Sequence, residues 1–347
     1  MRSRQRWIAA GLVTAALAVS TTACGSSGST ASGSGSGATI TLYNAQHEET
    51  TDALVSAFEK QTGIKVKVRN GDEAEFAQQI EQEGSHSPAD VFYTENSPAL
   101  MELEEKNLLA PVAPATLANV DSKYNPPAGD WVGVSARVSC LVYNTSALPT
   151  ASVPTSIFDL ADPKWKGKLA LAPAETDFLP IVTAIAKAKG DAAALSWLQA
   201  VKHNAAGHIY PDNETLVADV NRGSATIGVI NHYYWFRMRK ESDAKMNSAI
   251  AYFAPNDPGY LIDVSGAGVL RSSKHQSEAQ KLLAFLVSKQ GEAVLAKGVS
   301  YEYPLGSGAA ASPELRPFAQ LQPDPLGISD FGDGSGALKL LQEAQLL

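Results

Sequence analysis

Residues 225–241 read ATIGVINHYYWFRMRKE, and the rest of the chain is organised around this stretch. Its first part, residues 225–230, is apolar and rich in β-branched side chains, which predicts a short buried strand. Residues 236–241 combine good helix formers with basic side chains, which predicts a helix. Tyr233 and Tyr234 therefore lie where a strand ends and a helix begins. Ligands of open α/β sheets bind at this rim, outside the carboxyl ends of the strands.

The first third of the chain alternates strands and helices. Period-two or apolar runs predict strands at residues 39–43, 64–68 and 89–93, and amphipathic spacing predicts helices at residues 48–61, 73–83 and 98–105. This alternation predicts an α/β fold with a mostly parallel sheet and helices on both faces.

A second α/β unit follows the helix-breaking Asn125-Pro126-Pro127. Its predicted strands are residues 169–172 and 225–230, its predicted helices are residues 178–189, 192–201 and 213–221, and a later helix covers residues 276–287. Residues 131–143 and 259–270 each read as one extended segment, which suits a crossing between two lobes. Two α/β lobes joined by more than one crossing are typical of receptors that close about a hinge.

The first residues of the chain indicate export. Residues 1–23 combine three arginines, an apolar run that is too short to span a bilayer, and small residues before Cys24, which predicts a signal peptide. These small residues resemble the bacterial lipobox, although Thr21 stands where an aliphatic residue is usual. We therefore expect Cys24 to be lipidated and residues 24–38, rich in Ser and Gly, to form a flexible tether. Ordinary cleavage that leaves a free Cys24 is the alternative.

Composition narrows the class of protein further. The chain of 347 residues has a formal net charge of −8, which argues against a nucleic-acid partner. Cys140 is the only other cysteine and lies in a strand-like run, so we expect a buried, inert thiol. No activating base stands near it in the sequence, which disfavours a catalytic cysteine.

Candidate ligand residues follow three of the predicted strands: His47, Glu95 and the pair Tyr233 and Tyr234. One neutral imidazole, one carboxylate and two phenolates together balance the charge of a trivalent cation, and they leave two of six octahedral positions for water or a small anion. The set is too hard for copper(I), and it lacks the cysteines of structural zinc. On residue type alone, a lone His at a strand end is more often solvated or structural than a ligand, and Tyr-Tyr pairs are commonly packing or sugar-stacking aromatics.

Four motifs give this set more weight: ITLYNAQH at residues 40–47, PADVFYTE at 88–95, PKWKGK at 163–168 and NHYYW at 231–235. In order and approximate spacing they resemble the ferric-ion-binding proteins of bacterial ABC importers. The resemblance implies a two-lobed type II periplasmic-binding fold with hinge strands. It also implies that His47, Glu95, Tyr233 and Tyr234 hold Fe³⁺ with an exogenous anion. Residues that help to seat the anion in some relatives map to Asn96, Asn213 and Asn231.

One departure from the family concerns the anion. Glu175-Thr176-Asp177 stands where relatives that use phosphate have a small Ser-Gly-Ala-like turn at a helix start. Helix N-termini attract anions, but two carboxylates at this point would repel phosphate. We therefore expect carbonate, hydroxide or water in preference to phosphate, with Thr176 and Asp177 near the site; Asp177 alternatively caps the helix. Some relatives use a further tyrosine near the hinge, which makes Tyr143 a possible additional ligand, although a packed strand aromatic is the alternative for it.

These observations predict a monomeric lipoprotein outside the cytoplasm. It would be held at the membrane by its lipid only, and it would pass Fe³⁺ to an ABC permease. We expect one lobe to comprise residues 39–139 and about 264–314, and the other to comprise about 140–263 and 315–347. A receptor for an organic solute such as a polyamine, sugar or phosphonate is the first alternative. A metal-dependent hydrolase that uses His47 and Glu95 is the second, but no separate general base is evident, so we do not expect an enzyme.

Overall fold

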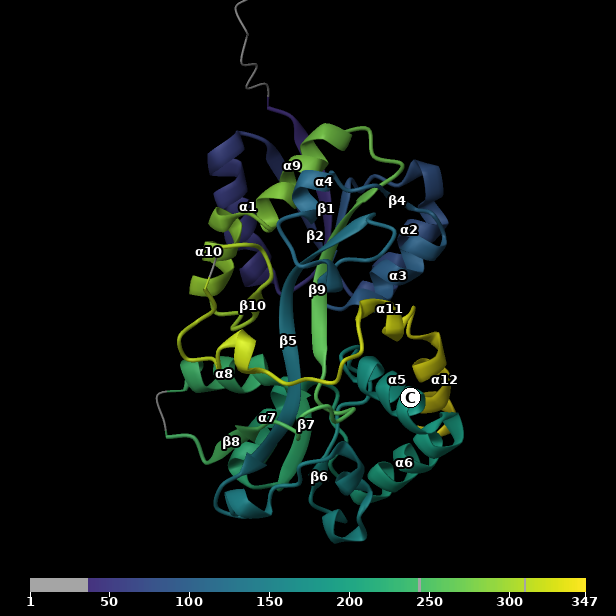
Figure 1. Ribbon diagram of the computed structural model, residues 1–347, viewed down its shortest axis with the longest axis vertical. Coiled ribbons are helices and arrows are strands. Elements are labelled where there is room, and N and C mark those ends of the chain that lie inside the picture. Colours follow the sequence, from purple (N-terminus) through teal and green to yellow (C-terminus); the bar gives the residue numbers. More distant parts are fainter. Residues whose placement is uncertain (1–36, 243–244, 309) are drawn as a thin grey trace, which may run out of the picture. The chain divides into compact units, whose positions relative to one another are not determined.

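A computed structural model of the chain describes residues 37–242, 245–308 and 310–347 (Figure 1). The predicted signal peptide and Cys24 lie outside these residues, as does most of the tether. None of the helices in the described part is long and apolar enough to cross a membrane.

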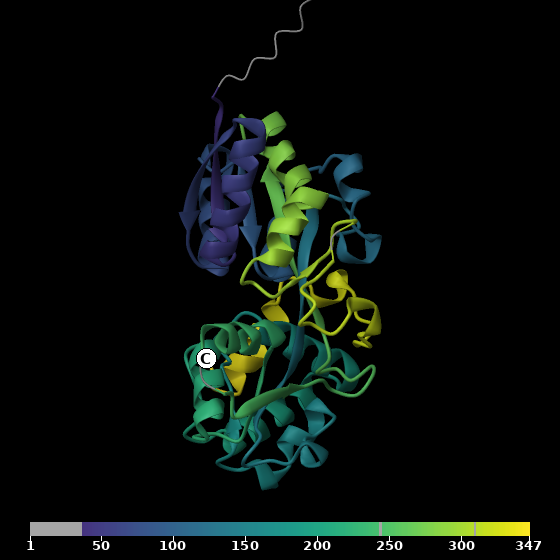
Figure 2. The same ribbon diagram turned by 90° about the vertical axis from the view of Figure 1, so that its left-hand side faces the viewer.

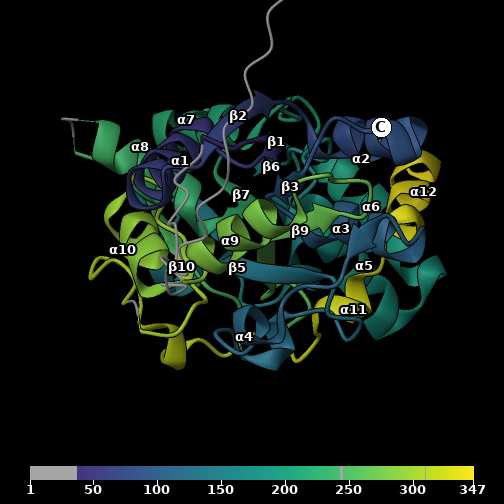
Figure 3. The same ribbon diagram turned by 90° about the horizontal axis from the view of Figure 1, so that it is seen from above.

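The first group of strands forms as the sequence predicts. Strand β1 (Thr39–Ala45) pairs in parallel with β2 (Lys65–Asn70) and with β3 (Val91–Thr94). Helix α1 (Glu48–Thr62) buries Leu54, Val55 and Phe58 on one face and ends at Gly63, whose positive φ of 72° closes the last turn. Helices α2 (Glu73–Glu83) and α3 (Ser97–Glu105) lie on the opposite side of these strands from α1 and α9 (Gln276–Leu286), as the view from above shows (Figure 3).

Two long strands connect this group to the second one. The first part of β5 (Trp131–Asn144) pairs with β9 (Ile262–Leu270), from Trp131 opposite Gly268 to Val138 opposite Ile262. From Ser139 onward β5 pairs instead with β7 (Ile227–Asn231) and, from Leu141, with β8 (Ser248–Ala251). Figures 1 and 2 show β5 and β9 running side by side between the two groups of helices. The predicted crossings at residues 131–143 and 259–270 are therefore confirmed. The lobe boundaries given above stay a proposal.

The predicted parallel pairing is confirmed for β1, β2 and β3, but it does not extend to most of the rest of the sheet. Only the β1–β2, β1–β3 and β6–β7 pairs are parallel among the described strands, and β6 is Leu169–Ala170. The crossing strand β9 runs antiparallel to β3, and β5 runs antiparallel to β7, β8 and β9. Neighbouring strands are parallel when a helix connects them, and the alternation of strands and helices led to that prediction. The chain instead crosses between the two groups as extended strands, and these pair antiparallel with their neighbours.

The second group is built around β7. Helix α8 (His232–Glu241) begins directly after β7, so Tyr233 and Tyr234 lie in its first turn rather than before the helix. Helix α12 (Ser335–Glu343) packs against α5 and α6. The other helices of this group are α5 (Phe178–Lys189), α6 (Asp191–Asn204) and α7 (Asn213–Arg222).

Shorter elements complete the chain. They are β4 (Leu109–Ala110), β10 (Tyr303–Pro304), α4 (Pro114–Leu117), α10 (Lys289–Lys297) and α11 (Ile328–Phe331). Short 3₁₀ turns lie at Gly84–His86, Ser122–Tyr124, Thr150–Ser152, Ile157–Ala161, Pro163–Trp165 and Phe318–Gln320. Cys140 is a buried free thiol on β5, as predicted, and burial raises its pKa, which keeps the thiol protonated and unreactive.

Candidate metal-binding site

The parallel strands β1 and β3 bring His47 and Glu95 together. Ala45 at the end of β1 is paired with Thr94 at the end of β3, so the residues that follow both strands emerge at one edge. His47 Nδ1 lies 2.9 Å from Glu95 Oε1, while its Nε2 is buried without a hydrogen-bond partner among the described residues. One nitrogen is thus held by the carboxylate and the other is left to bind a ligand. A cavity of about 550 Å³ opens beside this pair.

His47 and Glu95 each stabilise the charged form of the other. Burial alone would raise the pKa of Glu95, but the attraction and hydrogen bond of His47, with the nearby Arg137 and Arg237, lower it to about 2. Burial alone would lower the pKa of His47, and the Glu95 carboxylate raises it above its ordinary value instead. Glu95 is therefore an anion at any physiological pH, which suits a cation ligand.

The two tyrosines face the same place. Their ring centroids are 4.1 Å apart, and the Tyr233 ring lies 5.1 Å from the His47 ring in an edge contact. Both side chains are buried, and the Tyr233 hydroxyl has no hydrogen-bond partner among the described residues. Burial, followed by the negative charge of Glu95, raises the pKa of Tyr233 well above its ordinary value. Both phenols therefore keep their protons unless a strongly polarising cation replaces them.

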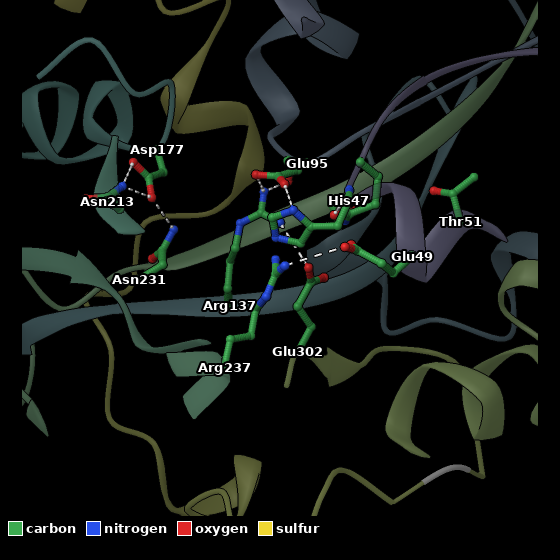
Figure 4. Close-up of polar contacts among 12 residues, drawn as sticks. His47, Glu49, Thr51, Glu95, Arg137, Asp177, Asn213, Asn231, Arg237 and Glu302 are labelled. Carbon is green, nitrogen blue, oxygen red and sulfur yellow. Dashed lines mark hydrogen bonds and ion pairs between the residues drawn. The ribbon is translucent and has the colours of Figure 1, made fainter. Parts of the chain in front are cut away.

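Arg137 is a buried cation beneath these ligands, and sequence reasoning missed it. On β5, its Nη2 lies 3.8 Å from Glu95 Oε2 and 3.1 Å from Asn96 Oδ1, and its Nη1 lies 3.6 Å from Glu302 Oε1. Its guanidinium carbon is 5.9 Å from the centre of the Tyr233 ring, and Figure 4 shows it between Glu95 and Glu302. A lone charge inside the apolar run 131–143 was the signal that could have marked it.

Arg237, also missed, lies one turn after Tyr233 on α8. Its Nη2 is 3.8 Å from Glu49 Oε2, so the pair joins the second strand group to the start of α1 (Figure 4). Its positive charge helps to lower the pKa of Glu95 and opposes the rise that burial causes in the pKa of Glu214, so it faces the same acidic surroundings.

The Asp177 carboxyl group accepts hydrogen bonds from two of the side-chain amides that were expected to bind an anion. Asn213 Nδ2 donates to both of its oxygens at 3.2 Å, and Asn231 Nδ2 donates to Oδ2 at 3.1 Å (Figure 4). The alternative that Asp177 caps α5 is wrong, because its side chain makes no capping hydrogen bond. The two asparagine amides compete successfully with the free N–H groups of the helix. Burial, followed by the charge of Glu175, raises the pKa of Asp177 well above its ordinary value.

Asn96 and Thr176 also meet at the site. Asn96 Nδ2 donates to Thr176 Oγ1 at 2.9 Å, which joins the residue after Glu95 to the residue before Asp177. Glu175 lies close by, and burial, with the charges of Glu214 and Glu95, raises its pKa to about 7.

The structure does not bring Tyr143 to this set. It lies on β5 opposite Ile227, at the start of β7, whereas the tyrosine pair follows the end of that strand. Its hydroxyl is 3.0 Å from Thr150 Oγ1, so it has a local partner. In the described part of the chain no group of three or more His, Cys, Asp or Glu side chains is placed to hold a metal ion.

The family model of the bacterial extracellular solute-binding proteins matches residues 86–322. The chain belongs to this family. The solute-binding protein is 43% identical over 309 residues to the "Fe(3+)-binding periplasmic protein" of Serratia marcescens, which covers 89% of this chain and 90% of that one. It is 39% identical to the "Major ferric iron-binding protein" of Neisseria meningitidis, over 88% of this chain and 93% of the relative.

Among solved structures, iron-bound HitA from Pseudomonas aeruginosa superposes with a TM-score of 0.84 at 44% identity, over 88% of this chain and 99% of that chain. The resemblance to the ferric-ion-binding family and the periplasmic-binding fold that it implied are thereby confirmed. The prediction that this solute-binding protein is not an enzyme agrees with the family to which it belongs.

Proposed function

We propose that this solute-binding protein captures Fe³⁺ outside the cytoplasm through His47, Glu95, Tyr233 and Tyr234 and passes it to a membrane permease. One observation carries the proposal: two adjacent buried phenols lie against the His47–Glu95 pair, where the ends of β1, β3 and β7 meet. The relatives named above are described as ferric-binding proteins, which supports the same cargo.

Charge and donor type favour Fe³⁺ over divalent metals. Glu95 and two phenolates supply three negative charges, and the imidazole is neutral when it binds a metal. The raised pKa values of Tyr233 and Tyr234 mean that removing their protons is costly, so only a strongly polarising cation makes the exchange favourable. Zn²⁺ and Mn²⁺ would use His47 and Glu95 but would leave both phenols protonated.

The remaining positions of the metal suit a small ligand rather than phosphate. Asn213 and Asn231, whose amides could hold an anion, already donate to Asp177. Burial and neighbouring negative charge already raise the pKa of Glu175 and of Asp177, and a phosphate anion beside them would add to that charge. We expect carbonate or water to complete the shell.

Capture would be coupled to closure. His47 and Glu95 follow β1 and β3, while the tyrosines follow β7, so one ion bound to all four ties the two strand groups together. A ligand that binds the closed form better shifts the population toward it. A lipid on Cys24 would keep the receptor at the membrane, where a permease accepts the ion.

Metal titration tests this function. Purified protein stripped of metal is titrated with ferric nitrilotriacetate and followed by visible absorption. We expect one Fe³⁺ per chain and a visible band from phenolate-to-iron charge transfer, and we expect no comparable band with Zn²⁺. The proposal fails if the protein stays colourless after ferric loading. It also fails if the Tyr233→Phe, Tyr234→Phe double variant binds Fe³⁺ as well as the wild type does.

A further inference from the structure

Glu73, the first residue of α2, has a buried carboxylate without a cationic partner among the described residues. Its exposed fraction is 6%, although ionised carboxylates are rarely buried unless they are paired. Its partners are instead hydrogen-bond donors on the turn after β3. Asn96 donates to it from its backbone N at 3.0 Å and from its side-chain Nδ2 at 2.9 Å, and the Thr94 hydroxyl donates to the same carboxylate.

These donors flank the proposed metal ligand Glu95 on both sides. Thr94 precedes Glu95 and Asn96 follows it, so one carboxylate holds both neighbours. The Glu95 side chain is left to point the other way, toward His47 and Arg137. Outer partners of this kind fix the direction in which a metal ligand points.

The same hydrogen bonds reach the second strand group. Asn96 Nδ2, which donates to Glu73, also donates to Thr176 Oγ1 at 2.9 Å, so Asn96 links the Glu73 carboxylate to Thr176. Arg137 Nη2 donates to Asn96 Oδ1, so both the oxygen and the nitrogen of that amide are hydrogen-bonded. Thr176 belongs to the segment between β6 and α5, next to Asp177, so this chain of hydrogen bonds forms only when the two groups are close.

We propose that Glu73 is a positioning residue with two effects: it aims Glu95 at the metal, and through Thr176 it latches the closed form. This rests on the proposed function, because it assigns a role relative to the proposed ligand. Glu73 itself does not touch the metal. The inference predicts that the two effects can be separated, since only Thr176 lies in the second strand group.

Two substitutions separate these effects. Glu73→Ala leaves the donors of Asn96 and Thr94 without an acceptor and frees the Glu95 turn, so we expect ferric affinity to fall roughly 10- to 100-fold and the visible band to shift. Thr176→Val keeps the shape but loses one hydroxyl. We expect its visible band to be unchanged and its iron release to a competing chelator to be roughly two- to tenfold faster, the size of one hydrogen bond. Thr176→Ser restores the hydroxyl and should restore slow release.

Thermal unfolding of each metal-free variant shows whether a change is merely structural: Thr176→Val should unfold at the wild-type temperature while still releasing iron faster. If Glu73→Ala does not fold, Glu73→Gln replaces it, because its amide can accept fewer of these hydrogen bonds. Wild-type affinity in the Glu73 variant together with wild-type release from Thr176→Val would overturn the inference. If the wild-type protein itself gives no ferric band, the proposed function fails instead, and the two failures are told apart.

Discussion

Tyr233 places a buried phenol with no hydrogen-bond partner in the described structure against His47. Tyr233→Phe removes that oxygen and keeps the ring, so the fold should be retained. We expect ferric affinity to fall by more than roughly 100-fold, the upper range for the loss of an outer-shell partner, and the visible band to weaken. Tyr143→Phe is the matched control, because the Tyr143 hydroxyl bonds to Thr150 and not to the site. Equal losses in both variants would contradict this assignment.

Asp263 should make the folding stability depend on pH without involving the proposed metal ligands. It lies on β9 opposite Arg137, and neither of its oxygens has a hydrogen-bond partner in the described part. Burial raises its pKa to about 7, against the attraction of Arg137, from an ordinary value of 3.8. Between these two values the folded protein holds a proton that the unfolded chain has lost. Folding stability from this group therefore decreases as the pH rises toward about 7.

Asp263→Asn removes this titration. The free energy of unfolding of the metal-free variant, relative to wild type, should rise between about pH 4 and pH 8 by on the order of 4 kcal/mol. Denaturant unfolding at a series of pH values measures the difference. A difference that does not change with pH would show that Asp263 stays ionised in the folded protein.

Residue types at strand ends were enough to predict that His47 and Glu95 meet, because the parallel strands β1 and β3 end at one edge. Tyr233 and Tyr234 follow β7 in the second strand group, and they were expected here because strand ends of two lobes can face each other across a cleft. Arg137 and Glu73 were not predictable in the same way. Glu73 reads as an ordinary polar residue at a helix start, and its buried carboxylate depends on Thr94 and Asn96, which come from later in the chain. Arg137 depends on Glu95 and Glu302, which approach it only once β5 has crossed between the strand groups.

The β5–β9 crossing depends on glycine where the strands meet other elements. A Cβ on Gly266 would lie 2.7 Å from Trp131 Cε3 and 2.8 Å from Leu100 Cδ1, both buried side chains. Gly266→Ala should therefore destabilise the protein by about 1–3 kcal/mol through overpacking. Gly336→Ala, in helix α12 where a Cβ meets nothing within 4 Å, should be neutral or stabilise by up to about 1 kcal/mol. Thermal unfolding of both variants checks this, and a stable Gly266→Ala would mean that β9 can shift.

Helix positions were predictable because their apolar spacing is local: α2 and α5 begin and end where the pattern predicts. The antiparallel direction of the crossing strands β5 and β9 was not predictable in this way, because it depends on which distant strands the chain brings together. The start of α5 shows the same limit, since the capping preference of Asp177 is a local property that the distant Asn213 and Asn231 override.

The two strand groups share β5, and the chain returns from the second group to the first through β9, which gives a receptor whose halves can move about these strands. The extended segments at 131–143 and 259–270 made this architecture predictable. An ion bound to residues from both groups should hold them together. We expect ferric loading to lower the radius of gyration in small-angle X-ray scattering, and to raise the free energy of unfolding by about 2.7 kcal/mol when free ferric ion is at 100 times its Kd.

The Tyr233→Phe, Tyr234→Phe double variant is the control for this closure. It keeps His47 and Glu95 on the first strand group but has no phenol on the second, so any metal that it binds has no ligand there to pull the groups together. Its radius of gyration should not respond to iron. A decrease equal to that of the wild type would mean that closure is driven by contacts other than the phenols, such as Asn96 with Thr176 and Arg237 with Glu49. In that case the ion would follow closure rather than cause it.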